Sequence, residues 1–370
     1  MIVVIDSNIF FSDFLMRRPR FRLIREEARE GRFQLAIPEV VVQETVNLYR
    51  EELVKAHASL QDRIQKPLSR LNELESGLQP STDLDIDATV ATYERLLRER
   101  LADVRANVLP LPNVPEQDVI DRALARRKPF KRSDAGYRDT LIWESVLRVA
   151  QDDDVVLISN NQNDFGEDDT PESLASHLKE DLAAAGLPAE RVVLVHDTTP
   201  FIDRYVPASA VLLQQVRDAT QTPESPLFAQ FASVIQQAVL DYPVGRETPR
   251  GDRLDEIRLP YGGEADGANV SMFGDVTDIE IHEARDLAGN EAVLEFSADV
   301  EVTIEYFLPK WEAWQIDEDE SPRATFVERD WNEHYSWVEA ELELDLVLVG
   351  TFDTEQNDLT EVEILWATTP

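Results

Sequence analysis

Residues 2–8 read Ile-Val-Val-Ile-Asp-Ser-Asn, a short run of branched apolar residues that ends in three polar ones. Similar apolar runs occur at residues 33–37, 155–159 and 192–195, and helical patterns lie between them at 21–31, 38–53, 140–150 and 172–185. Short continuous apolar strands that alternate with helices are typical of a parallel sheet covered on both faces. Residues 1–207 are therefore expected to form an α/β domain.

A charged helical stretch interrupts this alternation. Residues 51–109 predict two long helices broken near 77–87, and a shorter helix is expected at 119–125, so that about 51–125 form a helical insertion. Pro38 is expected to occupy the first position of the helix at 38–53, which precedes the insertion, because proline is favoured at that position.

The last third of the chain has a different pattern. Apolar and acidic residues alternate at 275–282, 291–307, 324–328, 337–352 and 361–367. A period of two predicts antiparallel strands with one wet face. Residues 251–370 are therefore expected to form an acidic, mainly antiparallel β domain, a sandwich or barrel-like sheet. Residues 208–250 are expected to be a helical linker.

Charge and composition limit the classes of function. The formal net charge is −37, and residues 251–370 carry 32 acids against 6 bases, which is −26 of that total. Such a charge argues against a protein that coats nucleic acid. Cysteine is absent, which excludes disulfide scaffolds and thiolate sites. The N-terminal apolar run is too short for a signal sequence or a membrane span, so a cytoplasmic protein without a membrane partner is expected.

Four acids lie near the carboxyl ends of the predicted strands, where parallel sheets bind their ligands. Asp6 ends the first apolar run, Asp164 follows the run at 155–159, and Glu44 and Asp139 lie near the starts of two helices. Each alone also fits a helix cap, a turn or a solvated acid. Taken together, carboxylates that converge need a cation, and oxygen ligands without cysteine or a positioned histidine favour Mg²⁺ or Mn²⁺.

The order of these motifs resembles that of the PIN-domain nucleases, in the larger subgroup with a helical insertion. The resemblance covers about residues 1–200 and rests on Asp6-Ser-Asn, Pro38 to Glu44, Arg138-Asp139-Thr-Leu-Ile-Trp, and Ser159-Asn-Asn to Asp164-Phe. It implies a three-layer PIN-like domain and a metal-dependent endoribonuclease, toxin-like or RNA-processing, that hydrolyses phosphodiester bonds with a metal-activated water. The alternatives are a catalytically degenerate RNA-binding or scaffold protein and a DNA-directed nuclease.

By this resemblance Asp6, Glu44 and Asp139 are the first three acids of the site. Many relatives carry an aspartate where this chain has Asn161, and Asp164 follows three residues later. We expect Asp164 to supply the fourth carboxylate, with Asn161 as the alternative neutral ligand.

Basic residues flank the proposed acids. Arginines cluster at 17–25, and arginines and lysines cluster at 126–138. They fit phosphate contacts, and equally a solvated surface paired with local acids. The residues predicted to contact substrate are Asn8, Arg18, Lys131, Arg132, Arg138 and Asn161.

RNA, single-stranded or structured, is the expected partner, together with an antitoxin or other protein partner and a second copy of the chain. For the acidic β domain two hypotheses stay open. It is a partner-docking or autoinhibitory module, or it maintains solubility or dimerises.

Overall fold

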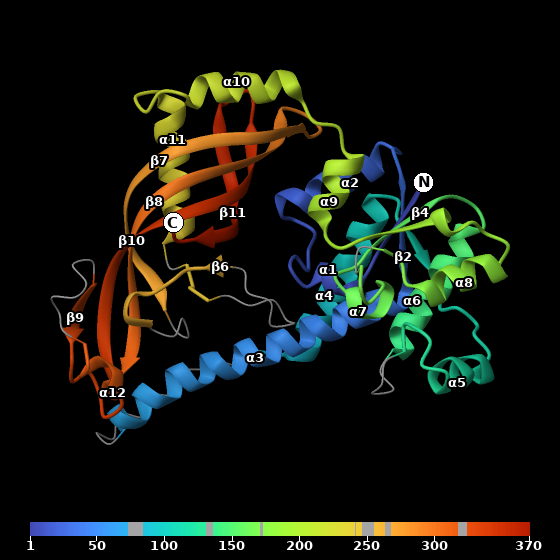
Figure 1. Ribbon diagram of the computed structural model, residues 1–370, viewed down its shortest axis with the longest axis horizontal. Coiled ribbons are helices and arrows are strands. Elements are labelled where there is room, and N and C mark those ends of the chain that lie inside the picture. Colours follow the sequence, from blue (N-terminus) through green and yellow to red (C-terminus); the bar gives the residue numbers. More distant parts are fainter. Residues whose placement is uncertain are drawn as a thin grey trace. The chain divides into compact units, whose positions relative to one another are not determined.

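The chain forms two compact units in the computed structural model (Figure 1), which describes residues 1–72, 84–130, 136–170, 173–240, 242–245, 255–262, 268–316 and 324–370. The first unit comprises Met1–Arg17 and Ile24–Val206. The second comprises Pro207–Pro370 together with Arg18–Leu23.

A five-stranded parallel sheet lies at the centre of the first unit. Its strands are β1 (Ile2–Ile5), β2 (Gln34–Pro38), β3 (Asn107–Leu109), β4 (Val155–Ile158) and β5 (Val192–Val195), in the order β3-β2-β1-β4-β5. All four residues of β1 and of β4 are buried, as continuous apolar strands in a covered sheet must be. The predicted α/β fold is confirmed.

Helices surround this sheet (Figure 1). They are α1 (Ser7–Phe10), α2 (Pro19–Arg29), α3 (Glu39–Asn72), α4 (Ile86–Asp103), α5 (Glu116–Leu124), α6 (Tyr137–Ala150), α7 (Gln162–Phe165), α8 (Ser176–Ala184), the 3₁₀ turn η1 (Ala189–Arg191) and α9 (Thr198–Tyr205). Pro38, expected to open a helix, is instead the last residue of β2, and α3 begins at the next residue. No helix in the described part of the chain is both long and apolar enough to cross a bilayer.

The prediction of a helix up to residue 109 is wrong at its end, because residues 107–109 form the edge strand β3. Arg105 has a φ of 54°, which reverses the chain after α4, and β3 then pairs with β2. A strand of three residues is too short to show a period of its own. Most of the predicted break at 77–87 lies outside the described residues, and α4 begins at Ile86.

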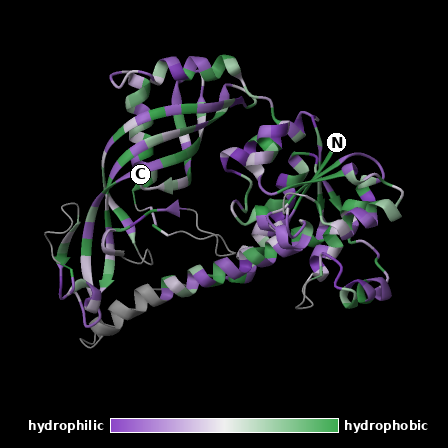
Figure 2. Cartoon of the chain, in the orientation of Figure 1, coloured by the Kyte–Doolittle hydropathy of each residue, from purple (hydrophilic) through white to green (hydrophobic). Residues whose placement is uncertain are grey.

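The second unit contains one six-stranded sheet instead of a sandwich of two. Its strands are β6 (Asp255–Glu256), β7 (Asn269–Asp286), β8 (Glu291–Pro309), β9 (Ala324–Glu328), β10 (Tyr335–Asp353) and β11 (Asp358–Thr368). The order is β6-β11-β10-β8-β7, with β9 beside β10, and every pair is antiparallel except β6 with β11. The predicted mainly antiparallel β domain is confirmed. Apolar and polar residues alternate within β8 at 295–305 and within β10 at 338–346 (Figure 2).

The helices expected in a linker belong to the core of this unit. They are α10 (Ala210–Thr220) and α11 (Pro226–Val239), and two short turns, η2 (Pro260–Gly262) and α12 (Lys310–Ala313), complete the helical elements. Phe231 of α11 is fully buried and packs against Phe296 of β8 and Phe352 of β10. The apolar side of α11 therefore replaces the second sheet that a sandwich would have supplied.

Candidate active site

Asp6 and Ser159 meet at the carboxyl ends of the two central strands of the first unit. β1 pairs with β4 so that Ile5 lies beside Ile158, and the next residue of each strand is Asp6 or Ser159. The chain runs from β1 outward to β2 and β3 on one side, and β4 and β5 lie on the other side. Ligands of open α/β sheets bind at such a switch in strand order.

The Asp6 carboxylate is buried and surrounded by donors. Only 3% of the residue is exposed. Its Oδ1 accepts the backbone N–H of Ser7 at 2.7 Å, and its Oδ2 accepts the Asn8 side-chain amide at 2.7 Å and the Ser159 hydroxyl at 2.5 Å. Asp6 also precedes α1 as its N-cap. The helix-cap interpretation and the site interpretation of this residue therefore both hold, because one oxygen caps while the other faces Ser159.

Glu44 and Asp139 reach the same region from α3 and α6, which contact each other. The Glu44 side chain is 14% exposed and forms an ion pair with Arg138, whose side chain is 63% exposed. Asp139 lies in the first turn of α6, and its Oδ1 accepts the Asn161 side-chain amide at 3.0 Å. Glu44 and Asp139 thus lie near enough to the strand end that carries Asp6 for their charges to act on it.

Gly136 fixes where α6 begins. Its φ is +129°, in a region that side-chain-bearing residues rarely adopt. A Cβ atom at this position would lie 2.5 Å from the carbonyl oxygen of Pro129. Glycine is therefore required at this close approach, three residues before Asp139.

Burial and neighbouring acids raise the pKa of Asp6 and of Glu44. Burial, and then the negative charge of Asp139, raise the pKa of Asp6 from 3.8 to about 6, and Glu44 contributes in the same direction. Burial also raises the pKa of Glu44, while its ion pair with Arg138 opposes the shift. Such shifts are typical of functional sites, where burial and neighbouring like charges disfavour the ionised carboxylate.

Carboxylate oxygens are suitable ligands for a divalent cation, but these carboxylates are not arranged around a common ion position. Among the residues that the structure describes, no three acidic or imidazole side chains are placed to share an ion. In this structure Arg138 pairs with Glu44, and the Asn161 side-chain amide donates to Asp139. A cation would compete with these donors for the same oxygens.

The comparison with protein families agrees with this geometry. The sequence profile of the PIN domain matches residues 3–165, a range that includes Asp6, Glu44, Asp139 and Asp164. The first unit carries a PIN domain. PIN domains are generally nucleases and commonly depend on divalent metals. No curated protein and no solved structure matches the chain.

The PIN domain brings together some of the residues predicted from sequence. Asn8 contacts Asp6 through its amide, and its Oδ1 accepts the backbone N–H of Asn160 at 3.1 Å. Asn161 contacts Asp139. Asp164 is 2% exposed within α7, and its place in a ligand set stays a prediction. Lys131 and Arg132 lie outside the described residues.

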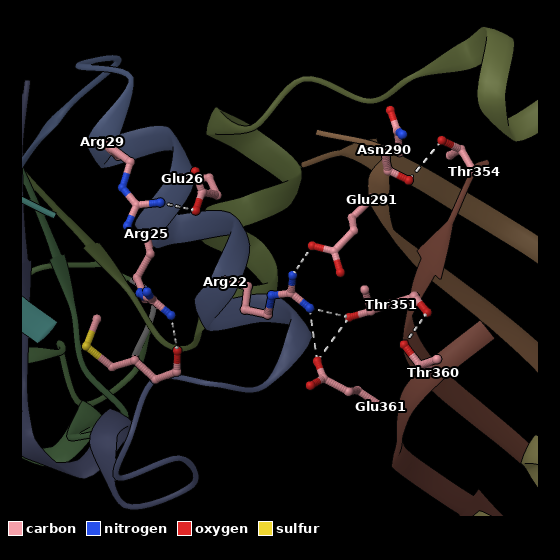
Figure 3. Close-up of polar contacts among 11 residues, drawn as sticks. Arg22, Arg25, Glu26, Arg29, Asn290, Glu291, Thr351, Thr354, Thr360 and Glu361 are labelled. Carbon is pink, nitrogen blue, oxygen red and sulfur yellow. Dashed lines mark hydrogen bonds and ion pairs between the residues drawn. The ribbon is translucent and has the colours of Figure 1, made fainter. Parts of the chain in front are cut away.

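Arginines of the 17–25 cluster contact acids of the second unit, to which residues 18–23 belong. Arg18 pairs with Glu363, and Arg20 pairs with Glu295 at 3.1 Å. Arg22 bonds to Glu361 at 3.0 Å and also pairs with Glu291 (Figure 3). In this arrangement the Arg18 guanidinium is engaged by a carboxylate, so the predicted phosphate contact of Arg18 requires that this ion pair opens.

Two hydroxyls of the PIN domain site were not predicted as functional residues. Ser159 donates to Asp6 and accepts the backbone N–H of Asn161 at 3.0 Å, so it links β1 to α7. The Ser7 hydroxyl bonds to Glu44, which opposes the rise in the pKa of that acid. The signal available in the sequence is a small hydroxyl residue directly after a buried strand, next to the strand that carries Asp6.

Proposed function

We propose that this protein is a metal-dependent endoribonuclease. The observation that supports the proposal best is the buried Asp6 carboxylate, whose pKa is raised to about 6 by burial and by the charges of Asp139 and Glu44. Burial of the Asp6 carboxylate beside two other acids costs stability, so a structural role alone accounts poorly for it. A PIN domain gives this arrangement a nuclease context.

Asp6, Glu44 and Asp139 would hold Mg²⁺ or Mn²⁺, with Asp164 as the proposed fourth carboxylate. A bound divalent ion supplies charge neutralisation at the phosphate and activates water for attack. Ser159 and Asn161 keep the carboxylates in place through hydrogen bonds to Asp6 and Asp139. The exposed guanidinium of Arg138 can leave Glu44 and bind a non-bridging phosphate oxygen.

The proposed substrate is RNA that is cut at an internal bond. The net charge of −37 opposes extended contact with a phosphate backbone, which favours a local contact through few cations, such as Arg138. Unpaired strands suit such a contact, because a short flexible segment can enter without a long basic groove. We place the protein with toxin-like or RNA-processing nucleases, for which an antitoxin or protein partner and a homo-oligomer are further proposals.

Cleavage of a mixed RNA pool tests the proposal. The wild-type protein should cut with Mn²⁺ or Mg²⁺ and not with EDTA, and Asp6→Asn should abolish cleavage. Asp152→Asn removes an exposed acid in the turn before β4 and should cut normally. Cleavage that persists in Asp6→Asn, or that never appears with either metal, contradicts the assignment. Single-stranded DNA of matching sequence serves as a second substrate, and preferential cleavage of DNA would indicate a DNA-directed nuclease.

A second candidate is an RNA-binding protein with a degenerate nuclease site. It is favoured by Asn161, which contacts Asp139 where many relatives carry an acid, and by the ion pair that occupies Glu44. A protein of this kind should bind RNA without cleaving it when a metal is added. Calorimetry should then detect no Mn²⁺ binding that depends on Asp6.

A further inference from the structure

The sheet of the second unit has one face that packs against α11 and an opposite face that points away from this helix. The register between β8 and β10 is unbroken over their whole pairing, so their side chains alternate strictly between two faces. Even-numbered residues such as Phe296 and Leu344 lie in the core with Phe231. Odd-numbered residues at 299–307 and 337–345 therefore share the opposite face.

Like charges stand directly opposite each other on this face. The register pairs Asp299 with Asp345, Glu301 with Glu343, and Glu305 with Glu339. Directly opposed like charges destabilise a sheet, whereas alternated charges or threonines would give an equally hydrated face without that cost. No lysine or arginine in the described ranges forms an ion pair with any of these six carboxylates.

The acids on this face raise the pKa of one of their number, Asp299. Burial, and then the charge of Asp345, raise the pKa of Asp299, and Asp278 and Glu280 of β7 act in the same direction, as does Glu343. The acidic face thus extends over three neighbouring strands. Its carboxylates would each be stabilised by an added positive charge.

A groove lined by both polar and apolar side chains runs into the acidic face. It has a volume of about 460 Å³, and exposed Met272 and Phe273 line it together with Glu301, Glu341 and Glu343. The register of β7 shifts on both sides of Met272 and Phe273, which opens the sheet edge there. A groove with apolar side chains and an acidic rim fits a segment that combines cationic and apolar side chains.

Aromatic side chains continue the same face beyond the last acidic pair. Phe307 lies opposite Trp337, and Trp331 stacks on Phe307 with the ring centroids 5.9 Å apart. Trp331 also meets Trp337 edge to face at 5.3 Å and is 45% exposed. Exposed tryptophan faces attract guanidinium groups, which stack better than ammonium groups.

We propose that this acidic–aromatic face, formed by the six opposed carboxylates with Met272, Phe273 and Trp331, docks an arginine-rich segment of a partner protein. The partner's guanidinium groups pair with the carboxylates and stack on Trp331, and its apolar side chains enter the groove. The charge of the face matches only a cationic partner, so it is distinct from any surface that meets RNA. The proposal does not depend on catalysis at the PIN domain.

Fluorescence anisotropy on the full chain tests this docking surface. The probe is a short fluorescein-labelled peptide with leucine at every third position and arginine elsewhere, compared with its lysine and glutamate counterparts. The surface variant is Glu301→Gln with Glu341→Gln and Glu343→Gln, all three exposed residues. The matched control is Glu116→Gln with Glu190→Gln and Glu224→Gln, which removes the same charge from exposed positions off the sheet.

The arginine peptide should bind the wild type and the control equally, and the surface variant roughly tenfold more weakly. Trp331→Leu should weaken the arginine peptide more than the lysine peptide. The surface variant should also unfold at a higher temperature than the wild type, because opposed like charges are removed, which shows that it is folded. Equal binding to the surface variant and the control, equal binding of the glutamate peptide, or no binding of the arginine peptide to the wild type overturns the proposal.

Discussion

Asp6→Asn provides a quantitative test of the carboxylate cluster in metal-free buffer. Burial and the neighbouring acids raise the pKa of Asp6 from 3.8 to about 6 in the folded protein. At about pH 8 the ionised carboxylate therefore costs about 3 kcal/mol of folding free energy, since each pKa unit corresponds to about 1.4 kcal/mol. The cost vanishes below the unfolded pKa and grows as the pH rises through the folded pKa. About 1.4 kcal/mol of it develops between pH 5 and pH 8.

The asparagine variant carries no such pH-dependent cost. Its amide replaces only one of the two carboxylate oxygens, so it loses either the bond from the Ser7 backbone N–H or the bonds from Asn8 and Ser159, which costs about 1–3 kcal/mol at every pH. The stability of Asp6→Asn relative to the wild type should therefore improve by about 1.4 kcal/mol from pH 5 to pH 8. Titrating groups that do not interact with Asp6 cancel in this comparison because both proteins contain them.

Urea unfolding followed by hydrogen exchange of peptides from β1 and β4 measures this difference in the first unit alone. Asp152→Asn, an exposed acid, is the control and should show no such trend. Adding Mn²⁺ at pH 8 to a hundredfold excess over its Kd should stabilise the wild type by about 2.7 kcal/mol and leave Asp6→Asn unchanged. A difference between variant and wild type that is the same at both pH values, or that favours the variant more at pH 5, refutes the reasoning.

Three further variants probe the surroundings of the carboxylates. Ser159→Ala should raise the pKa of Asp6 above its present value in a carbon-13 NMR titration, whereas Ser145→Ala, which removes a buried hydroxyl bonded only to the Leu141 carbonyl, should leave that pKa unchanged. Arg138→Gln should tighten Mn²⁺ binding by roughly twofold to fivefold in calorimetry, because an exposed ion pair worth up to about 1 kcal/mol no longer competes for Glu44. The same variant should raise the KM for RNA. Arg148→Gln at the far end of α6 is the control, and tighter Mn²⁺ binding by this control too would count against competition at Glu44. Gly136→Ala should lose about 1–3 kcal/mol of stability and weaken Mn²⁺ binding, because its Cβ displaces the start of α6 and hence Asp139. Gly186→Ala has a similarly positive φ but open space, so it should lose stability and bind Mn²⁺ normally.

The fold of the first unit follows from local pattern wherever the strands are buried on both faces. β1, β4 and β5 are continuous apolar runs between helical patterns, so both their type and their parallel arrangement could be predicted. β3 could not, because its three residues follow a long charged helix and pair with only one neighbour. In the second unit the apolar sides of α10 and α11 indicate burial, but a periodic pattern does not specify which surface covers it.

The candidate site was predictable to the extent that topology determines it. Asp6, Glu44 and Asp139 follow from a strand end and two helix starts, and the structure places their charges close enough to shift one another's pKa. The choice between Asn161 and Asp164 depends on the direction of side chains around a single helical turn, which spacing alone does not determine. Ser159 was part of the quoted motif but was given no functional role, because a serine after a strand is chemically ordinary until its neighbouring strand is known.

Asp6, Glu44 and Asp139 are proposed to form the binding site of a catalytic divalent ion. Anomalous diffraction from crystals grown with Mn²⁺ locates that ion. One strong manganese peak is expected at about 2 Å from carboxylate oxygens of Asp6 and Asp139, with Arg138 moved away from Glu44. A map in which manganese is absent from this cluster at saturating concentration, with the Arg138–Glu44 ion pair intact, contradicts the claim.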